Sequence, residues 1–138
     1  MSLVVDASSV LSLALPDEAV GEERSQWILR GLCMEGITVP AQWPVEVAGG
    51  LLRAERRGRC GGAFVSATLD LLAQLLVTLR PVVPGDWGRL MALARDQGLS
   101  VYDACYLDVA LRERLALVTL DTALSAAAGR LGVPLYGG

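Results

Sequence analysis

The sequence contains no histidine, lysine or asparagine, so all 12 of its positively charged side chains are arginines. Without histidine, neither a Ser-His-Asp triad nor a Cys-His nucleophile can be assembled. Without lysine, a P-loop phosphate site and a Schiff base are excluded as well. Any hydrolytic chemistry must therefore rest on carboxylates, hydroxyls or a bound metal ion.

Cysteines and long apolar runs are also scarce. Cys33, Cys60 and Cys105 are far apart and odd in number, which fits neither a disulfide framework nor a zinc cage, and we expect them to be small buried residues. No apolar run is long enough to span a membrane, and the first residues lack the basic region of a secretion signal. We therefore expect a cytoplasmic protein that makes no membrane contact.

The residues that are present indicate a folded α/β domain. The 138 residues are 53% hydrophobic and have a mean hydropathy of +0.46, so we expect a single domain over residues 1–138. Short apolar runs typical of strands alternate with longer segments of helical periodicity. This alternation predicts a three-layer α/β/α sandwich with a mainly parallel central sheet of about five strands. The expected strands are 3–5, 37–39, 77–79, 117–119 and 133–136, and the expected helices are 10–15, 19–34, 44–57, 62–76, 86–95, 102–114 and 122–130.

Two aspartates directly follow predicted strands. Asp6 ends the run LVVD and Asp121 ends the run LVTLD, and a predicted helix follows each of them. An ordinary helix N-cap is one interpretation of either residue. In open parallel sheets, however, ligands bind beyond the carboxyl ends of the strands, where two neighbouring joints would bring both carboxylates to one edge.

Two further acids lie in the first turns of predicted helices. Asp103 follows Ser100 with the spacing of a capping box, and a negative charge is also favourable there. Glu46 lies near the start of a helix that contains Pro44, and an exposed first-turn acid is the alternative interpretation. Asp108 lies about 140° around the helix axis from Asp103, so we expect it to be a solvated surface residue.

The helix that carries Glu46 also contains Gly49 and Gly50. A glycine inside a helix costs roughly 1 kcal/mol relative to alanine. Close approach of another backbone or of a ligand beside Glu46 would justify that cost.

Gathered at one sheet edge, the four acids would form a cation site. Each pair of charges would repel by roughly 3 kcal/mol at about 5.5 Å and an effective dielectric constant near 20, so the cluster would take up protons or bind cations. A site made of oxygen ligands alone favours Mg²⁺ or Mn²⁺ over zinc. Such ions can activate a water molecule and neutralise a phosphodiester, which indicates phosphodiester hydrolysis.

Four segments resemble the PIN-domain family, and specifically the VapC-type toxins of bacterial type II toxin–antitoxin systems. They are VVDASSVL, PVEVAGGLLRAERRG, YDACYLDVAL and LVTLDTALSAAAGRLGV, and together they extend over nearly the whole chain in the expected order. The resemblance implies that the catalytic, metal-coordinating acids are Asp6, Glu46, Asp103 and Asp121, with Ser8 and Thr119 as supporting polar residues.

The resemblance further implies an Mg²⁺- or Mn²⁺-dependent endoribonuclease, commonly a homodimer, that a cognate antitoxin protein holds inactive. The formal net charge of −3 and the pI near 4.9 depart from the more basic balance of many relatives and argue against a general electrostatic grip on RNA. Arginine can bind phosphate in a bidentate manner. The candidates for RNA contact are Arg53, Arg56, Arg57 and Arg59, for which a solvated helix end is the alternative interpretation.

Two other functions are compatible with parts of this pattern. The first is a PIN-fold module that binds RNA or protein without turnover. The second is a phosphatase with Asp6 as its nucleophile, but such enzymes usually need a second aspartate two residues later and a late basic residue. Ser8 and the missing lysine count against that alternative, and a receiver domain is disfavoured for the same reason.

Overall fold

The computed structural model describes residues 1–15 and 21–137, and short parallel strands lie at its centre. These strands are β1 (Val4–Val5), β2 (Ile37–Pro40), β3 (Val77–Arg80) and β4 (Leu117–Val118). β1 pairs with β4, β2 pairs with β3, and a bridge between Leu3 and Ile37 joins the two pairs. The order across the sheet is therefore β3, β2, β1, β4. The expected strand over 133–136 is reduced to a bridge between Leu117 and Leu135.

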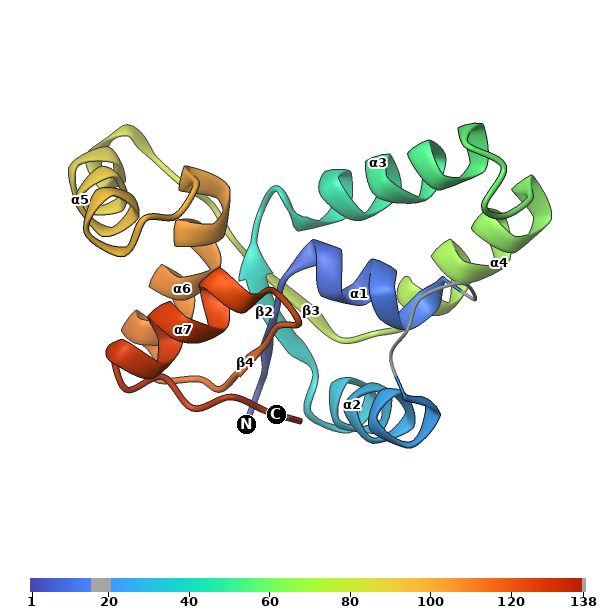
Figure 1. Cartoon of the computed structure of the whole chain (residues 1–138), viewed down its shortest axis with the longest axis horizontal. Helices are drawn as coiled ribbons and strands as arrows, with labels where there is room; N and C mark the ends of the chain where they lie inside the picture. The colour runs from blue at the N-terminus through green and yellow to red at the C-terminus, as the bar shows by residue number, and fades with distance from the viewer. Residues whose placement is uncertain (16–20, 138) are drawn as a thin grey trace.

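Helices cover this sheet from two sides (Figure 1). One side carries α1 (Ala7–Ala14), α2 (Glu22–Glu35), α3 (Trp43–Arg56) and α4 (Gly62–Leu72), and the other carries α5 (Trp87–Gln97), α6 (Val101–Glu113) and α7 (Thr122–Arg130). A short 3-10 helix (Pro84–Asp86) precedes α5. The predicted three-layer α/β/α fold with a parallel sheet is thus confirmed, although its strands are short. The expected start of α2 at Ala19 lies outside the described residues.

Three helices begin at side-chain caps that the sequence predicts. Asp6 caps α1, Ser100 caps α6 and Asp121 caps α7, and each side chain accepts a hydrogen bond from a backbone N–H three residues later. Such a bond satisfies one of the amide groups that the first helical turn leaves without a partner. Two of these caps stand at the carboxyl ends of β1 and β4, so the same residues fix the helices to the sheet edge.

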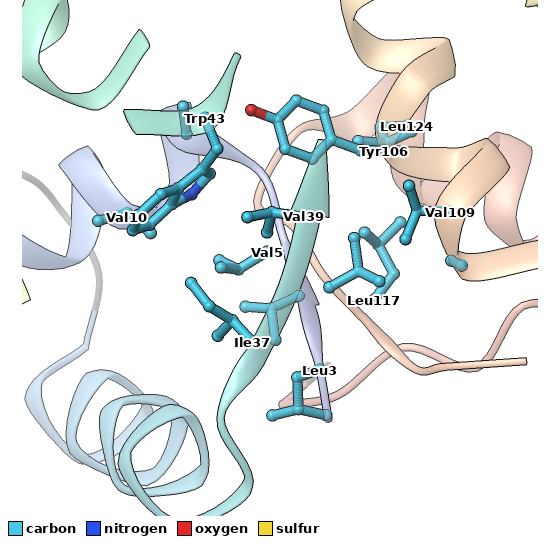
Figure 2. Packing of buried hydrophobic residues seen from close by; sticks show 14 of the residues in the cluster. Leu3, Val5, Val10, Ile37, Val39, Trp43, Tyr106, Val109, Leu117 and Leu124 are labelled. Atoms are coloured by element: carbon cyan, nitrogen blue, oxygen red, sulfur yellow. The ribbon is translucent and has the colours of Figure 1, made fainter. Parts of the chain in front are cut away.

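The hydrophobic core forms around β1, β2 and β4, whose residues are buried (Figure 2). Val10 and Trp43 contribute from one helical layer, and Tyr106, Val109 and Leu124 contribute from the other. Fully burying each large apolar side chain stabilises the fold by about 1.5 to 3 kcal/mol. The core therefore holds rigid the strand ends from which Asp6 and Asp121 project.

β3 differs from the other strands because all four of its residues are exposed. Val77 and Leu79 are 36% and 43% exposed, so this edge of the sheet is less covered by helices than its centre. Cysteine burial also varies: Cys105 is buried, as expected, but Cys33 is exposed. Among the described residues, no helix has the length and apolar character needed to cross a membrane.

Candidate active site

Asp6 lies at the joint between β1 and α1 and is only 2% exposed. Its Oδ1 accepts hydrogen bonds from the backbone N–H of Ser9 at 2.8 Å and from the Ser8 hydroxyl at 3.3 Å. Its Oδ2 accepts a hydrogen bond from the hydroxyl of Thr119. The residue is therefore an N-cap, but its second oxygen is bound by the residue that follows β4, which a cap alone does not require.

Thr119 connects the first and the last of the four acids. Its hydroxyl donates to Asp6 and accepts a hydrogen bond from the backbone N–H of Asp121 at 3.1 Å. Asp121 in turn caps α7 by accepting from the N–H of Leu124 at 3.2 Å. One buried hydroxyl thus holds the ends of β1 and β4 together and orients both aspartates.

Ser9 makes a second connection between the same two joints, although its sequence context does not predict this role. Its hydroxyl is buried and accepts a hydrogen bond from the backbone N–H of Leu120 at 2.8 Å. The signal in the sequence is weak, because Ser9 is one of two adjacent serines and its partner lies 111 residues away.

Asp103 and Asp121 face a shared hollow of about 380 Å³. Asp103 lies in the first turn of α6, where the Ser100 hydroxyl accepts a hydrogen bond from its N–H at 3.1 Å. The hollow is otherwise lined mainly by hydroxyls, and its remaining residues are Ser8, Ser9, Ser12 and Leu120. This lining is polar and lies beyond the carboxyl ends of β1 and β4, where ligands bind in open α/β sheets.

Glu46 approaches this edge from α3. Its Oε2 accepts a hydrogen bond from the hydroxyl of Tyr106 at 2.8 Å. Its Oε1 is buried and has no hydrogen-bond partner among the described residues. A buried carboxylate oxygen without a donor is costly, which makes it a natural ligand for a cation or an ordered water.

The four carboxylates influence one another electrostatically. Burial raises the pKa of Glu46, the hydrogen bond from Tyr106 opposes that shift, and the charges of Asp103 and Asp6 raise the pKa further. Burial likewise raises the pKa of Asp103, and the charges of Asp121 and Asp6 add to that effect. The structure therefore brings all four predicted acids into one electrostatically coupled group.

The carboxylate oxygens of these acids are suitable ligands for a hard divalent cation, although they do not form a complete coordination sphere. Within residues 1–15 and 21–137, no set of three or more His, Cys, Asp or Glu side chains is arranged to hold a metal ion. Mg²⁺ is, however, usually bound by one or two carboxylates and several waters, not by protein ligands alone. The oxygen-only donor set, the unsatisfied Oε1 of Glu46 and the mutual repulsion of the acids all fit such binding.

The helix α3 passes close to α1 beside the site. A Cβ atom on Gly50 would overlap the side chain of Leu11, so this glycine permits close packing of the two helices. At Gly49 a Cβ atom would meet only the Nη1 atom of Arg53, at 3.5 Å, and the packing gives no reason for that glycine. The expected close approach beside Glu46 is thus to another helix.

The candidate RNA-binding arginines extend away from the acids. Arg53 and Arg56 lie in the last turn of α3, Arg57 ends that helix, and Arg59 follows in the connection to α4. Arg57 is about 16 Å along the helix axis from Glu46, whereas Arg53 is about 10 Å away and its guanidinium lies beside Gly49. Arg53 is therefore the member of this group that reaches nearest to the carboxylates.

The expectation that Asp108 is a solvated surface residue is wrong. Asp108 is 7% exposed, and Arg89 of α5 donates to both of its carboxylate oxygens, at 2.9 and 3.0 Å. The periodicity of α6 correctly separates Asp108 from Asp103. It could not reveal that α5 covers that side of α6 and supplies a bidentate partner.

Comparison with known proteins points to one family. The family model described as PIN domain matches residues 3–130. VapC ribonuclease Mb0985 of Mycobacterium bovis is 37% identical over 123 residues, which are 89% of this chain and 88% of that protein. Ribonuclease VapC3 of Mycobacterium tuberculosis is 33% identical over 128 residues, which are 91% of this chain and 86% of that protein.

The fold comparison agrees with the sequence comparison. The crystal structure of PAE2754 from Pyrobaculum aerophilum superimposes with a TM-score of 0.67 and 28% sequence identity. The match covers 92% of this chain and 84% of the other. The similarity therefore extends over most of both chains.

Proposed function

The chain belongs to the PIN-domain family, and from this premise we propose that it is a metal-dependent endoribonuclease that hydrolyses phosphodiester bonds in RNA. The observation that carries the proposal is the polar hollow beyond the ends of β1 and β4, which Asp103 and Asp121 line. Asp6 and Glu46 are electrostatically coupled to Asp103 at the same place. The names of the relatives, VapC ribonuclease and ribonuclease VapC3, support RNA as the substrate. The absence of histidine and lysine leaves carboxylates as the groups able to handle protons at this edge.

In this proposal each acid has a defined place. The four carboxylates would hold Mg²⁺ or Mn²⁺, and such an ion supplies a more acidic bound water and positive charge for the phosphate. Thr119 keeps Asp6 and Asp121 in register through its two hydrogen bonds, and Ser8 donates to Asp6. The hydroxyl of Ser12, which also lines the hollow, can donate to a phosphate oxygen of a bound strand.

RNA binding would depend on local positive charge, because the whole chain is acidic. Among the described residues, no hydrogen bond or ion pair holds Arg53, Arg56 or Arg57. Their guanidinium groups are therefore available to phosphates of RNA that extends from the hollow along α3. Arg59 lies at the end of the same path.

Cleavage of RNA by the purified protein tests the proposal. We expect products with Mg²⁺ or Mn²⁺, none with EDTA, and none from the Asp6→Asn variant under either condition. Asp70→Asn, a change of an exposed acid on α4, is the matched control and should cleave like the wild type. Cleavage that persists both in EDTA and in Asp6→Asn would contradict the proposal, and metal binding without cleavage would favour a binding module.

We also propose that this chain is the toxin of a toxin–antitoxin pair, acts in the cytoplasm as a single domain over residues 1–138, and forms a homodimer. The VapC names of the relatives support the pairing. An exposed apolar surface around α4 and β3 supports binding of a protein partner, because large patches of this kind mark interaction sites. Two apolar hollows of about 310 and 450 Å³ flank Leu72 there.

The partner proposals have their own tests. The product of a small reading frame next to the gene should form a stable complex and stop RNA cleavage, whereas an unrelated antitoxin should do neither. Light scattering of the isolated chain should give twice the monomer mass. A monomer that still cleaves RNA would contradict the homodimer without affecting the proposed activity.

A further inference from the structure

Tyr106 is a buried tyrosine close to the acids, and its position in the sequence does not predict this location. It lies on α6, one helical turn after Asp103, and only 1% of it is exposed. Its ring packs in the core between the two helical layers, and its hydroxyl is directed towards Trp43 at the start of α3 (Figure 2). A phenylalanine would fill the same space, so the hydroxyl requires a separate explanation.

The hydroxyl of Tyr106 contacts two of the elements that carry the acids. It donates a hydrogen bond to Glu46 Oε2 at 2.8 Å, and it lies close to the backbone of Ala7, the residue next to Asp6. Tyr106 thus links α6 to α3 through its hydroxyl oxygen, close to the joint between β1 and α1.

Glu46 has few other constraints. The side chain of Gln42 lies within hydrogen-bonding range of Glu46, but no hydrogen bond of good geometry forms between them, and the buried Gln42 Nε2 has no other partner among the described residues. The hydrogen bond from Tyr106 therefore fixes which oxygen of Glu46 is occupied and leaves Oε1 as the oxygen without a protein donor. A pinned carboxylate loses less conformational entropy when it binds a ligand than a free one does.

We propose that Tyr106 is a positioning residue, whose hydroxyl holds Glu46 in the orientation in which its Oε1 binds the divalent cation. The inference rests on the proposed function, since it assumes a cation at the four acids. Partners of metal ligands orient the first layer of ligands in this way, and their loss typically weakens metal binding by about 10- to 100-fold.

The test is calorimetric titration of Mn²⁺ into the wild type, Tyr106→Phe and Tyr102→Phe. We expect about 10-fold weaker Mn²⁺ binding in Tyr106→Phe. Tyr102→Phe alters an exposed tyrosine in the first turn of the same helix and should bind Mn²⁺ like the wild type. Wild-type affinity in Tyr106→Phe would overturn the inference.

A double substitution separates positioning from a general structural effect. If Tyr106 acts through Glu46, adding Tyr106→Phe to Glu46→Gln should weaken Mn²⁺ binding no further than Glu46→Gln alone. A full additional loss would show that the tyrosine acts elsewhere and would overturn the inference. Thermal unfolding in EDTA establishes that each variant is folded.

One measurement needs no variant and so remains decisive if Tyr106→Phe fails to fold. In the wild type, the buried Tyr106 hydroxyl proton should be observable by NMR and should shift when Mg²⁺ is added, because its acceptor binds the cation. An unchanged resonance at saturating Mg²⁺ would overturn the role of Tyr106. A wild type that binds neither Mg²⁺ nor Mn²⁺ would contradict the proposed function itself, and the inference with it.

Discussion

Asp6 and Asp121 are held differently from Glu46 and Asp103, although all four acids belong to one group. Asp6 and Asp121 cap helices, and both contact the hydroxyl of Thr119. Glu46 accepts one hydrogen bond, through Oε2. The pKa values of Glu46 and Asp103 are both raised, and burial is the largest cause. The first pair is part of the scaffold that closes the sheet edge, whereas the second pair carries an unfavourable charge that a cation would relieve.

The largest expected effect is the loss of the scaffold carboxylate in Asp6→Ala. Removal of the N-cap costs about 1 kcal/mol, and the buried Thr119 hydroxyl left without its acceptor costs about 1 to 3 kcal/mol more. We expect the free energy of unfolding, measured in urea with EDTA, to fall by about 2 to 4 kcal/mol. Asp70→Ala, at an exposed position on α4, should stay within about 0.5 kcal/mol of the wild type. Equal stability of the two variants would remove the distinction between the pairs.

Thr119→Val tests the connection between the two scaffold acids. Valine keeps the shape but leaves Asp6 Oδ2 and the N–H of Asp121 without their partner. We expect a loss of about 1 to 3 kcal/mol in urea unfolding, together with weaker RNA cleavage. Thr78→Val, at an exposed position on β3, is the matched control and should change neither quantity. Full activity in Thr119→Val would contradict the role of this hydroxyl.

Asp103→Asn tests the other half of the comparison. The pKa of Asp103 is higher in the folded state than in the unfolded state. At pH values between these two pKa values the folded state binds more protons, so the stability of the wild type falls as the pH rises through that range. In EDTA we therefore expect Asp103→Asn to melt at a higher temperature than the wild type at neutral pH, with no advantage below the ordinary aspartate pKa.

Excess Mn²⁺ should reverse that order, because a ligand stabilises the folded state that binds it. Scanning calorimetry with and without Mn²⁺ measures both effects. A lower melting temperature for Asp103→Asn in EDTA at neutral pH would show that this acid carries no unfavourable charge.

The smallest expected effect concerns the arginines of α3. Arg53 lies nearest to Glu46, so Arg53→Ala should weaken RNA binding more than Arg57→Ala does. Each lost phosphate contact should reduce the slope of log affinity against log salt by about 1. Binding of a catalytically inactive Asp6→Asn background to RNA at several salt concentrations provides the measurement. Equal slopes in all three proteins would assign these arginines to a solvated helix end.

Local patterns in the sequence were sufficient for much of the fold. The alternation of apolar runs and helical periods predicted the layers and the parallel sheet. The position of Asp6 and Asp121 directly after strands predicted that both would lie at one sheet edge, because parallel strands end on the same side. These features depend on residues that are close in the sequence, so a local sequence pattern can predict them.

Contacts between distant segments could not be predicted in the same way. The sequence around Tyr106 indicates only an apolar core residue. Its hydrogen bond to Glu46 joins residues 60 positions apart, which no local pattern predicts. The sequence predicts an exposed acid at Asp108, whereas in the structure Arg89 of α5 donates a hydrogen bond to it. The sequence predicts that β3 is a strand of the central sheet, but it does not show that all four of its residues are exposed.

Calorimetric titration of Mn²⁺ into the metal-free protein tests most directly whether the four carboxylates act as one cation site. We predict saturable binding by the wild type, at least about 10-fold weaker binding by Asp6→Asn and by Asp103→Asn, and unchanged binding by Asp70→Asn. Equal Mn²⁺ affinity in all four proteins, or no binding by the wild type, would contradict the existence of such a site.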